Sequence, residues 1–487
     1  MTSLTFYGGV GEIGGNKILV EDNGTRLLLD FGMSFNQSGK YFSEFLQPRK
    51  CNCIEDLMKT GLLPDLEGVY RQDYLCHLRK NKQDRNVDGV LLSHAHADHA
   101  AYTHFLRKDI PIYMSPESQV ILQALEDTGS GSFLDFIHHT ETFKLCAKKN
   151  GTGKKRLTGE EAKTERPLQT FKFGEKFNVD DIEITPYEVD HSLPGATAFI
   201  IHANEGTILY TGDLRFHGYK QKETKRMIEE SIKEGVDVCI IEGTNAGKEQ
   251  GQTEEDVLTK AGAKVEETEK LVIVNFPGRD LARLQTFYDI SKKTERKLVL
   301  TFKQAYLLEL MSKIGKDYPN IDDENIGFYA ERKSWGLIGR DDYPPEIISQ
   351  DYFKWEKKYL DLPNTFTHKD VTEKQSNYIF YCDYFQLKNL IDINPAPKSN
   401  YIRSVCEPFD EEMLFDYNRV KNWLDLFSLP MTQIHASGHA NESRLFDMLK
   451  KIDPTKIYPI HTDSPEAFSE KFDNAVIIEK EKKYELG

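Results

Sequence analysis

The segment that most constrains the fold is a run of metal-binding residue types that directly follows an apolar strand. The run is His94-Ala95-His96-Ala97-Asp98-His99, and the apolar residues of 87–93 predict a buried strand that ends in a turn just before it. Imidazole nitrogens and carboxylate oxygens are ligands of zinc and similar first-row ions. A single ion would be satisfied by two histidines and one further group, so four ligands on one loop suggest two ions sharing a site. A histidine-rich surface loop fits less well, because the run follows a strand and small alanines fill its gaps.

Two later segments offer further ligands. His191 follows a predicted strand in the turn-forming stretch 187–195, and Asp213 ends the predicted strand 207–213. Taken alone, a histidine in this position is more often structural, and a Gly-Asp pair is usually a turn. Because they follow the 94–99 loop in this order, both become candidate ligands. The two oxygens of Asp213 can each bind one ion of a pair about 3.5–4 Å apart, an arrangement that clamps a phosphate during displacement.

Together with Asp30 in Leu27-Leu28-Leu29-Asp30-Phe31-Gly32, these segments resemble the metallo-β-lactamase superfamily. The resemblance implies an α/β fold in which two sheets form an αββα sandwich. The glycine-rich opening 7–16 resembles ribonuclease J and its relatives more specifically. Its glycines permit tight turns, but it does not match a dinucleotide or P-loop fingerprint, because the spacing differs and the run leads into a strand.

The C-terminal half resembles the β-CASP group of this superfamily, whose members act on nucleic acids. Glu242 follows the strand 238–241, His439 lies in the small-residue turn 434–440, and His461 follows the predicted last strand. Members acting on RNA typically have histidine at the third place, whereas DNA-processing members have valine, so His461 favours RNA. The following Thr462-Asp463-Ser464 departs from the Gly-Glu that relatives of ribonuclease J often carry.

The resemblance implies two divalent metal ions, with zinc favoured over manganese. One ion would be held by His94, His96 and His191. The other would be held by Asp98, His99 and His461, with Asp213 shared between them. The residues expected to carry catalysis are Asp98, Asp213, Glu242 and His439.

Substrate contacts are expected in the turn around His439. This histidine would contact the scissile phosphate or protonate the leaving oxygen, and Glu242 would hold its imidazole in one tautomer. Ser437 and Gly438 offer a hydroxyl and a backbone N–H to a phosphate, although a simple tight turn is equally compatible with them. His435 is either a phosphate-binding or stacking residue or a packed structural one.

The resemblance implies a division of the chain into three parts. Residues 1–245 would form the first part of the metallo-β-lactamase domain, 246–429 would form an inserted β-CASP domain, and 430–487 would return to complete the first domain. Residues 34–86 are predicted to be an insertion with helices around 53–60 and 70–82. From residue 253 on, strands and helices alternate, which indicates a mostly parallel sheet flanked by helices.

Composition and charge narrow the class of protein and its cellular location. The formal net charge of −15 argues against a general nucleic-acid coating protein, although metal ions supply local positive charge. The sequence has no apolar run long enough to span a bilayer and no secretory signal at its start. Seven cysteines without a regular framework suggest reduced thiols and a cytoplasmic protein, and the sequence leaves a homodimer open. Six basic residues flank a predicted hairpin tip at 150–153, which is either a solvated loop or a phosphate contact: Lys144, Lys148, Lys149, Lys154, Lys155 and Arg156.

Three functions remain. The leading hypothesis is a metal-dependent ribonuclease that acts on single-stranded RNA. The first alternative is a DNA nuclease of the same group, or a nuclease of that group with mixed specificity. The second is a protein that is not a nuclease, either a hydrolase of small esters or thioesters or an RNA-binding protein without activity. The complete ligand set disfavours lost activity, and the long segment between Glu242 and His439 suits a polymer better than a small molecule.

Overall fold

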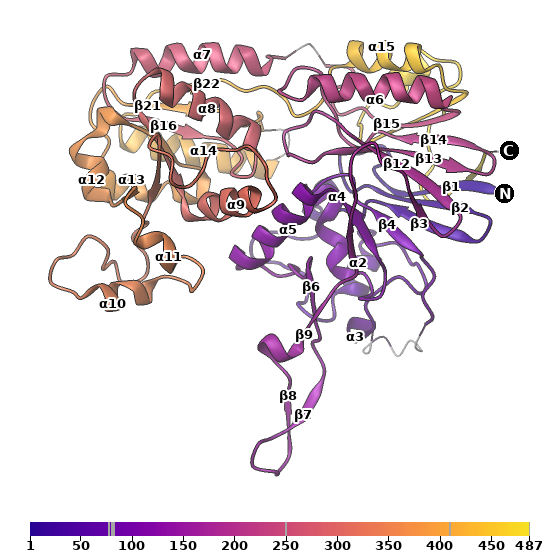
Figure 1. The fold of residues 1–487 in the computed structure, drawn as a ribbon, viewed down its shortest axis with the longest axis horizontal. Helices are drawn as coiled ribbons and strands as arrows, with labels where there is room; N and C mark the ends of the chain where they lie inside the picture. The colour runs from indigo at the N-terminus through magenta and orange to yellow at the C-terminus, as the bar shows by residue number, and fades with distance from the viewer. Residues whose placement is uncertain (76–77, 79–82, 249–250, 409–410, 487) are drawn as a thin grey trace.

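The computed structural model describes residues 1–75, 78, 83–248, 251–408 and 411–486. It confirms the expected mixed α/β fold, which contains three large sheets. Two of these sheets face each other, and the third lies beside them with its own helices (Figure 1).

The first sheet has seven strands in the order β10-β5-β4-β3-β2-β1-β24. Its strands are β10 Leu168–Thr170, β5 Ile112–Met114, β4 Gly89–Leu91, β3 Thr25–Leu29, β2 Lys17–Asp22, β1 Thr2–Gly8 and β24 Lys483–Glu485. β3 and β4 are parallel neighbours, so their carboxyl ends meet at one edge of the sheet. Asp30 comes directly after β3, and the 94–99 loop follows β4 closely.

The second sheet has six strands in the order β11-β12-β13-β14-β15-β23. Its strands are β11 Phe177–Val179, β12 Ile182–Glu188, β13 Thr197–Ala203, β14 Gly206–Tyr210, β15 Val238–Glu242 and β23 Lys456–Ile460. β14, β15 and β23 are adjacent and parallel. Their carboxyl ends therefore bring together Asp213, Glu242 and His461, which are far apart in the sequence.

The two sheets form a sandwich with helices on both outer faces. Apolar residues of both sheets, such as Leu4 of the first and Ile201 of the second, form one buried cluster between them. Helices α6 (Gln221–Glu234) and α15 (Glu442–Ile452) cover the outer face of the second sheet. Helices α2 (Ile54–Lys59) and α5 (Pro116–Thr128) pack on the outer face of the first sheet. This is the predicted αββα arrangement.

The third sheet is parallel throughout and has the order β19-β18-β17-β20-β16-β21-β22. Its strands are β19 Thr365–Phe366, β18 Ile326–Tyr329, β17 Lys297–Thr301, β20 Tyr378–Tyr381, β16 Val272–Asn275, β21 Asn400–Arg403 and β22 Met431–Gln433. The flanking helices include α7 Glu254–Glu267, α8 Leu281–Lys293, α9 Phe302–Lys313, α10 Pro345–Ile348, α11 Lys357–Leu360, α12 His368–Glu373, α13 Asn389–Ile393 and α14 Glu411–Leu426. The alternation of strands and helices predicted from the sequence is confirmed here. β22 lies just past the predicted boundary at residue 429, yet it pairs with β21 of this sheet.

Several local expectations need correction or completion. Of the helix expected over 70–82, the described residues include the turn α3 (Gln72–Leu75), and residues 76–77 and 79–82 lie outside the described part. The segment 34–86 also contains the short helix α1 (Phe35–Gly39). The predicted hairpin around 150–153 is confirmed, since β7 (Leu145–Ala147) pairs with β8 (Lys154–Arg156), and it projects from the body (Figure 1). β6 (His138–Thr140) and β9 (Lys163–Glu165) form the second small pair.

No helix among the described residues is long and apolar enough to cross a membrane. Four described cysteines, Cys53, Cys146, Cys239 and Cys382, are free thiols, as the sequence predicts for those positions.

Candidate metal centre

The 94–99 loop is held in place by the glycine-rich opening of the chain. The backbone N–H of Asn16 donates to the carbonyl of Asp98 over 3.0 Å. Gly14, with a φ of +84°, packs so closely that a Cβ atom there would lie 2.7 Å from Cβ of Asp98. Only glycine combines this backbone conformation with this close approach. The glycine-rich run 7–16 therefore shapes the loop that carries the candidate metal ligands.

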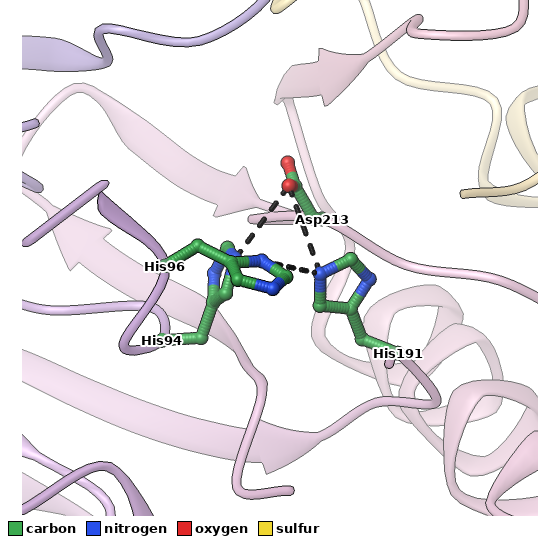
Figure 2. Close-up of side chains that lie close together, drawn as sticks. All are labelled: His94, His96, His191 and Asp213. Atoms are coloured by element: carbon green, nitrogen blue, oxygen red, sulfur yellow. Dashed lines mark hydrogen bonds and ion pairs between the residues drawn. The ribbon is translucent and has the colours of Figure 1, made fainter. Parts of the chain in front are cut away.

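The first group of candidate ligands consists of His94, His96, His191 and Asp213, which point toward one another (Figure 2). Nε2 of His94 lies 2.9 Å from Nδ1 of His96, and Nε2 of His191 lies 3.1 Å from the same atom. Nδ1 of His191 donates to the carbonyl of Gly438 over 2.6 Å, so its Nε2 presents a lone pair to the group. Ring nitrogens of His94 and His191 thus both lie close to Nδ1 of His96. Since a neutral imidazole carries only one proton, this cluster of nitrogens fits a cation that they share.

The second group consists of Asp98, His99, Asp213 and His461. Nδ1 of His99 donates to Asp30 over 2.7 Å, so its Nε2 faces the other members of the group. That atom lies 3.2 Å from an oxygen of Asp213 without the geometry of a hydrogen bond. Burial lowers the pKa of His99, but Asp213 and Asp30 outweigh it and raise the value well above the usual one. Nε2 of His461 lies 3.1 Å from Asp98. A cation between these atoms would satisfy all of them.

Asp213 belongs to both groups and is almost completely buried, at 1% exposure. Neither of its oxygens has a hydrogen-bond partner of acceptable geometry among the described residues. Burying a carboxylate is costly unless it is paired with a cation or coordinates a metal. The donor set and this unsatisfied carboxylate therefore fit two metal ions that share Asp213.

Asp30 lies behind the loop and holds it through hydrogen bonds. It accepts hydrogen bonds from the backbone N–H and the hydroxyl of Ser93, both at 2.7 Å, from His99 and from the hydroxyl of Tyr210. Its φ is +56°, a left-handed conformation that is uncommon outside glycine. The surrounding hydrogen bonds hold it there, and they fix the tautomer of His99.

A third group joins Asp213 and His461 to Glu242 and His439. Nδ1 of His439 lies 3.2 Å from both oxygens of Glu242. The hydroxyl of Thr244 lies 2.8 Å from Nδ1 of His461 and 3.2 Å from Nδ1 of His439. Thr244 was not predicted, because a threonine two residues after a strand carries no distinctive signal in the sequence.

Burial and neighbouring charges shift the pKa values of the histidines in opposite directions. Burial lowers the pKa of His94 and His191 well below the usual value and that of His96 to about 4, so these imidazoles are neutral and able to bind metal. Burial also lowers the pKa of His439, but Glu242 and Asp213 outweigh it and raise the value to about 9. His439 is therefore protonated at neutral pH in the ion-free protein.

The turn 435–439 is fixed by buried contacts. The hydroxyl of Ser437 accepts from the backbone N–H of His439 over 3.1 Å, and the carbonyl of Gly438 accepts from His191. His435 contacts the carbonyl of Ser404 and the guanidinium of Arg283. Burial lowers its pKa to about 3, so it resembles a packed structural residue.

Ser437 and His439 also line a cavity of about 630 Å³. Lys248 and Arg444 border the same cavity, together with Glu254, Glu255 and His217, whose pKa burial lowers. Positive charge for an anionic group therefore comes from Lys248, Arg444 and His439.

A buried ion cluster that the sequence did not predict ties this turn to the third sheet. Glu254, at the start of α7, accepts from Arg215 over 2.7 Å and from Arg283 over 2.9 Å. Arg283 also donates to the carbonyl of Ala436, and Arg215 pairs with Asp190 at 3.2 Å. Asp190 precedes His191, so the cluster links the first metal group to the third sheet. Its members lie far apart in the sequence, and no local pattern joins them.

Comparison with known proteins gives a consistent result. Residues 53–271 match the β-lactamase superfamily domain. The chain is 26% identical over 315 residues to ribonuclease J of Pyrococcus abyssi, which covers 61% of this chain and 58% of that protein. It is 23% identical over 471 residues to ribonuclease J of Mycoplasma genitalium, which covers 94% of this chain and 68% of that protein. The chain thus spans about three fifths to two thirds of the length of these curated relatives.

A solved structure has the same fold over nearly the whole length. It is a protein of unknown function from Enterococcus faecalis V583, with a TM-score of 0.71, 23% identity and 99% coverage of both chains. At this identity the match supports the fold over 99% of the chain and carries no statement about activity.

Proposed function

We propose that the chain is a metal-dependent ribonuclease that hydrolyses phosphodiester bonds of single-stranded RNA. The match of residues 53–271 to the β-lactamase superfamily domain and the similarity to ribonucleases J support this proposal. The observation that carries the proposal is the convergence of three ligand groups on the buried Asp213. Many enzymes of unrelated function share a fold, so the assignment depends on this site and not on the sandwich.

We propose that His94, His96 and His191 hold one divalent ion, that Asp98, His99 and His461 hold the other, and that Asp213 is shared. Zinc suits this mixture of imidazole and carboxylate ligands, and manganese is the alternative. Two such ions would stabilise the negative charge that develops on the phosphodiester during in-line displacement.

The remaining roles belong to the side chains themselves. His439 carries a proton that Glu242 stabilises, and it is placed to give this proton to the leaving oxygen. Asp30 keeps Nε2 of His99 directed at the centre. Ser437 and Gly438 are proposed to contact a substrate phosphate, whereas His435 is proposed to support the turn from inside.

We further propose that the third sheet and its helices are a β-CASP domain inserted into the metallo-β-lactamase domain. The predicted divisions at residues 245/246 and 429/430 are retained except that β22 favours a second division after Gln433. RNA is favoured over DNA because His461 stands where RNA-processing relatives carry histidine. The 2′-hydroxyl, which donates and accepts hydrogen bonds, allows a protein to distinguish the two.

The free thiols of Cys53, Cys146, Cys239 and Cys382 agree with a cytoplasmic protein, which is part of the proposal. Light scattering coupled to size-exclusion chromatography distinguishes a monomer from a homodimer. Whether the enzyme trims ends or cuts internally is decided by the products formed from end-labelled RNA.

The test is a matched set of strands. Wild-type protein loaded with zinc or manganese is incubated with end-labelled single-stranded RNA, DNA of the same sequence, a duplex, and a chromogenic lactam and thioester. We expect cleavage of single-stranded RNA in preference to all others. Equal cleavage of DNA would identify a nuclease without RNA preference, and turnover of the lactam or thioester alone would overturn the proposal.

A further inference from the structure

A second cavity lies away from the candidate metal centre, between the end of α5 and the third sheet. Its volume is about 820 Å³, within the range of small-molecule and nucleotide sites. None of the candidate metal ligands lines it. Its lining begins with residues 127–130 and continues with three segments that follow β17, β18 and β20. We refer to it as the α9 cavity, because the first residues of α9 form part of its wall.

The position of the α9 cavity in the sheet is one where ligands bind. β18, β17 and β20 are adjacent parallel strands, and all three end at the cavity. In open α/β sheets, ligands bind outside the carboxyl ends of the strands. The N-terminus of α9 also lies here, and its backbone N–H groups favour an anion.

Two buried polar groups in the wall have no partner. The amide nitrogen of Asn389 and the hydroxyl of Tyr329 lack a hydrogen bond to any described residue, and the two residues are 2% and 5% exposed. Both residues line the α9 cavity. Buried polar groups are almost always hydrogen-bonded, so an unpaired pair at one cavity indicates a ligand that completes them.

The remaining wall combines aromatic rings, cations and carboxylates, and Lys333 is paired with Glu356. Phe385 and Phe353 are exposed by 78% and 63%, which is unusual for rings of this size. The amine of Lys333 lies 5.0 Å from the centre of the Phe353 ring. Lys303 is exposed in the first turn of α9. Exposed rings on which bases stack, beside cations for the backbone, are characteristic of sites for single-stranded nucleic acid.

Helix α9 runs from this cavity toward a third cavity that one candidate metal ligand lines. A third cavity, of about 840 Å³, is lined by His191 and by residues 316–320, which come just after the other end of α9. α5 runs beside α9, since Tyr306 donates to Asp127 over 2.7 Å near one end and Lys316 pairs with Glu117 near the other. α9 has 12 residues and is therefore about 18 Å long, which a stacked strand covers in about five nucleotides.

We propose that the α9 cavity binds a nucleotide of the single-stranded RNA about five nucleotides away from the bond that is cleaved. The base stacks on Phe385 or Phe353, the phosphate meets Lys303 and the start of α9, and Asn389 and Tyr329 pair with polar atoms of the nucleotide. This inference rests on the proposed ribonuclease function and adds a remote binding site to it.

The test compares a double variant with a matched control. Lys303→Ala with Phe385→Ala removes one cation and one ring of the cavity, and both side chains are exposed, so folding should be unaffected. Lys354→Ala with Trp335→Ala removes an equally exposed cation and ring that do not line the cavity. Cleavage of RNAs of about 4 and about 12 nucleotides is measured, lengths that fall below and above the span of α9.

We expect the Lys303 and Phe385 variant to raise KM for the longer RNA by about tenfold, as for loss of one stacked base, and to leave the shorter RNA unaffected. The control variant should behave as wild type on both. An unchanged KM for the longer RNA, or an equal loss on both lengths, would overturn the inference.

Binding in chelator separates this inference from the proposed activity. Fluorescence anisotropy of a labelled RNA of about 12 nucleotides is measured without metal, where cleavage cannot contribute. Weaker binding by the Lys303 and Phe385 variant, in a protein that never cleaves RNA when metal is restored, would support the cavity and refute the ribonuclease. Cleavage with no difference in binding between the two variants would refute the cavity alone.

Discussion

Replacing Glu254 by alanine should destabilise the protein more than any exposed substitution in the same helix. The carboxylate is 4% exposed and accepts from Arg215 and from Arg283, which are themselves completely buried. Glu254→Ala would leave both guanidiniums without their shared partner. Removing one member of a buried ion pair is strongly destabilising, because the opposite charge stays buried without compensation.

The magnitude follows from the environment of the carboxylate. Burial raises the pKa of Glu254, but Arg283 and Arg215 outweigh it and lower the value from 4.5 to about 2. At about 1.4 kcal/mol for each pKa unit, the ionised form is stabilised by about 3 kcal/mol. This agrees with the loss of about 3–5 kcal/mol that follows removal of one partner of a buried pair.

The assay is urea unfolding at pH 7, with Glu255→Ala as the control. Glu255 is exposed in the same first turn of α7, and its loss should cost about 0.3–1 kcal/mol through the helix dipole. Since the pKa of Glu254 is lowered in the folded state, its contribution is fully present above pH 4.5 and declines as the pH falls toward 2. If Glu254→Ala and Glu255→Ala unfold at the same urea concentration, the ion cluster of Glu254, Arg215 and Arg283 does not stabilise the fold.

Three further predictions concern the centre and its surroundings. Asp213→Ala should lose both metal content and activity, whereas His439→Ala should keep its metal and lose a factor of about 10²–10⁴ in RNA cleavage. Elemental analysis measures the metal content of both variants, and equal metal content in the two would contradict this prediction. Asp30→Asn should weaken metal affinity by about 10–100-fold through misorientation of His99, and a competition titration with a chromogenic chelator that gave wild-type affinity would argue against its supporting role. Burial raises the pKa of Asp280 from 3.8 to about 6, so its contribution to stability falls as the pH rises from about 4 to about 6. Asp280→Asn should therefore gain stability relative to wild type between pH 4 and pH 6, and denaturation curves with a constant difference across that window would refute this.

The residues that lie at strand ends could be predicted from the sequence. His94–His99, Asp213, Glu242 and His461 each follow an apolar strand, and parallel strands bring their carboxyl ends together at one edge. The pairing order was not predictable from the local pattern alone. It came from the resemblance, which supplied the expected sequence of ligands from Asp30 to His461.

Features made by distant residues could not be predicted. Glu254 meets Arg283 across 29 positions and Arg215 across 39, and neither pair has a helical or strand spacing. His435 remained ambiguous for the same reason, since its surroundings are Ser404 and Arg283. β22 is only three residues long and half-buried, so its pattern is too weak to place it in the third sheet.

The most direct test of the account follows metal content and RNA cleavage in the same samples. Ion-free protein is titrated with zinc and, separately, with manganese, and each sample is divided between elemental analysis and cleavage of end-labelled single-stranded RNA. The account predicts that cleavage rises with metal content and levels off near two ions per chain, and that Asp213→Ala reaches neither value. Full RNA cleavage by wild-type protein that holds no metal would contradict it.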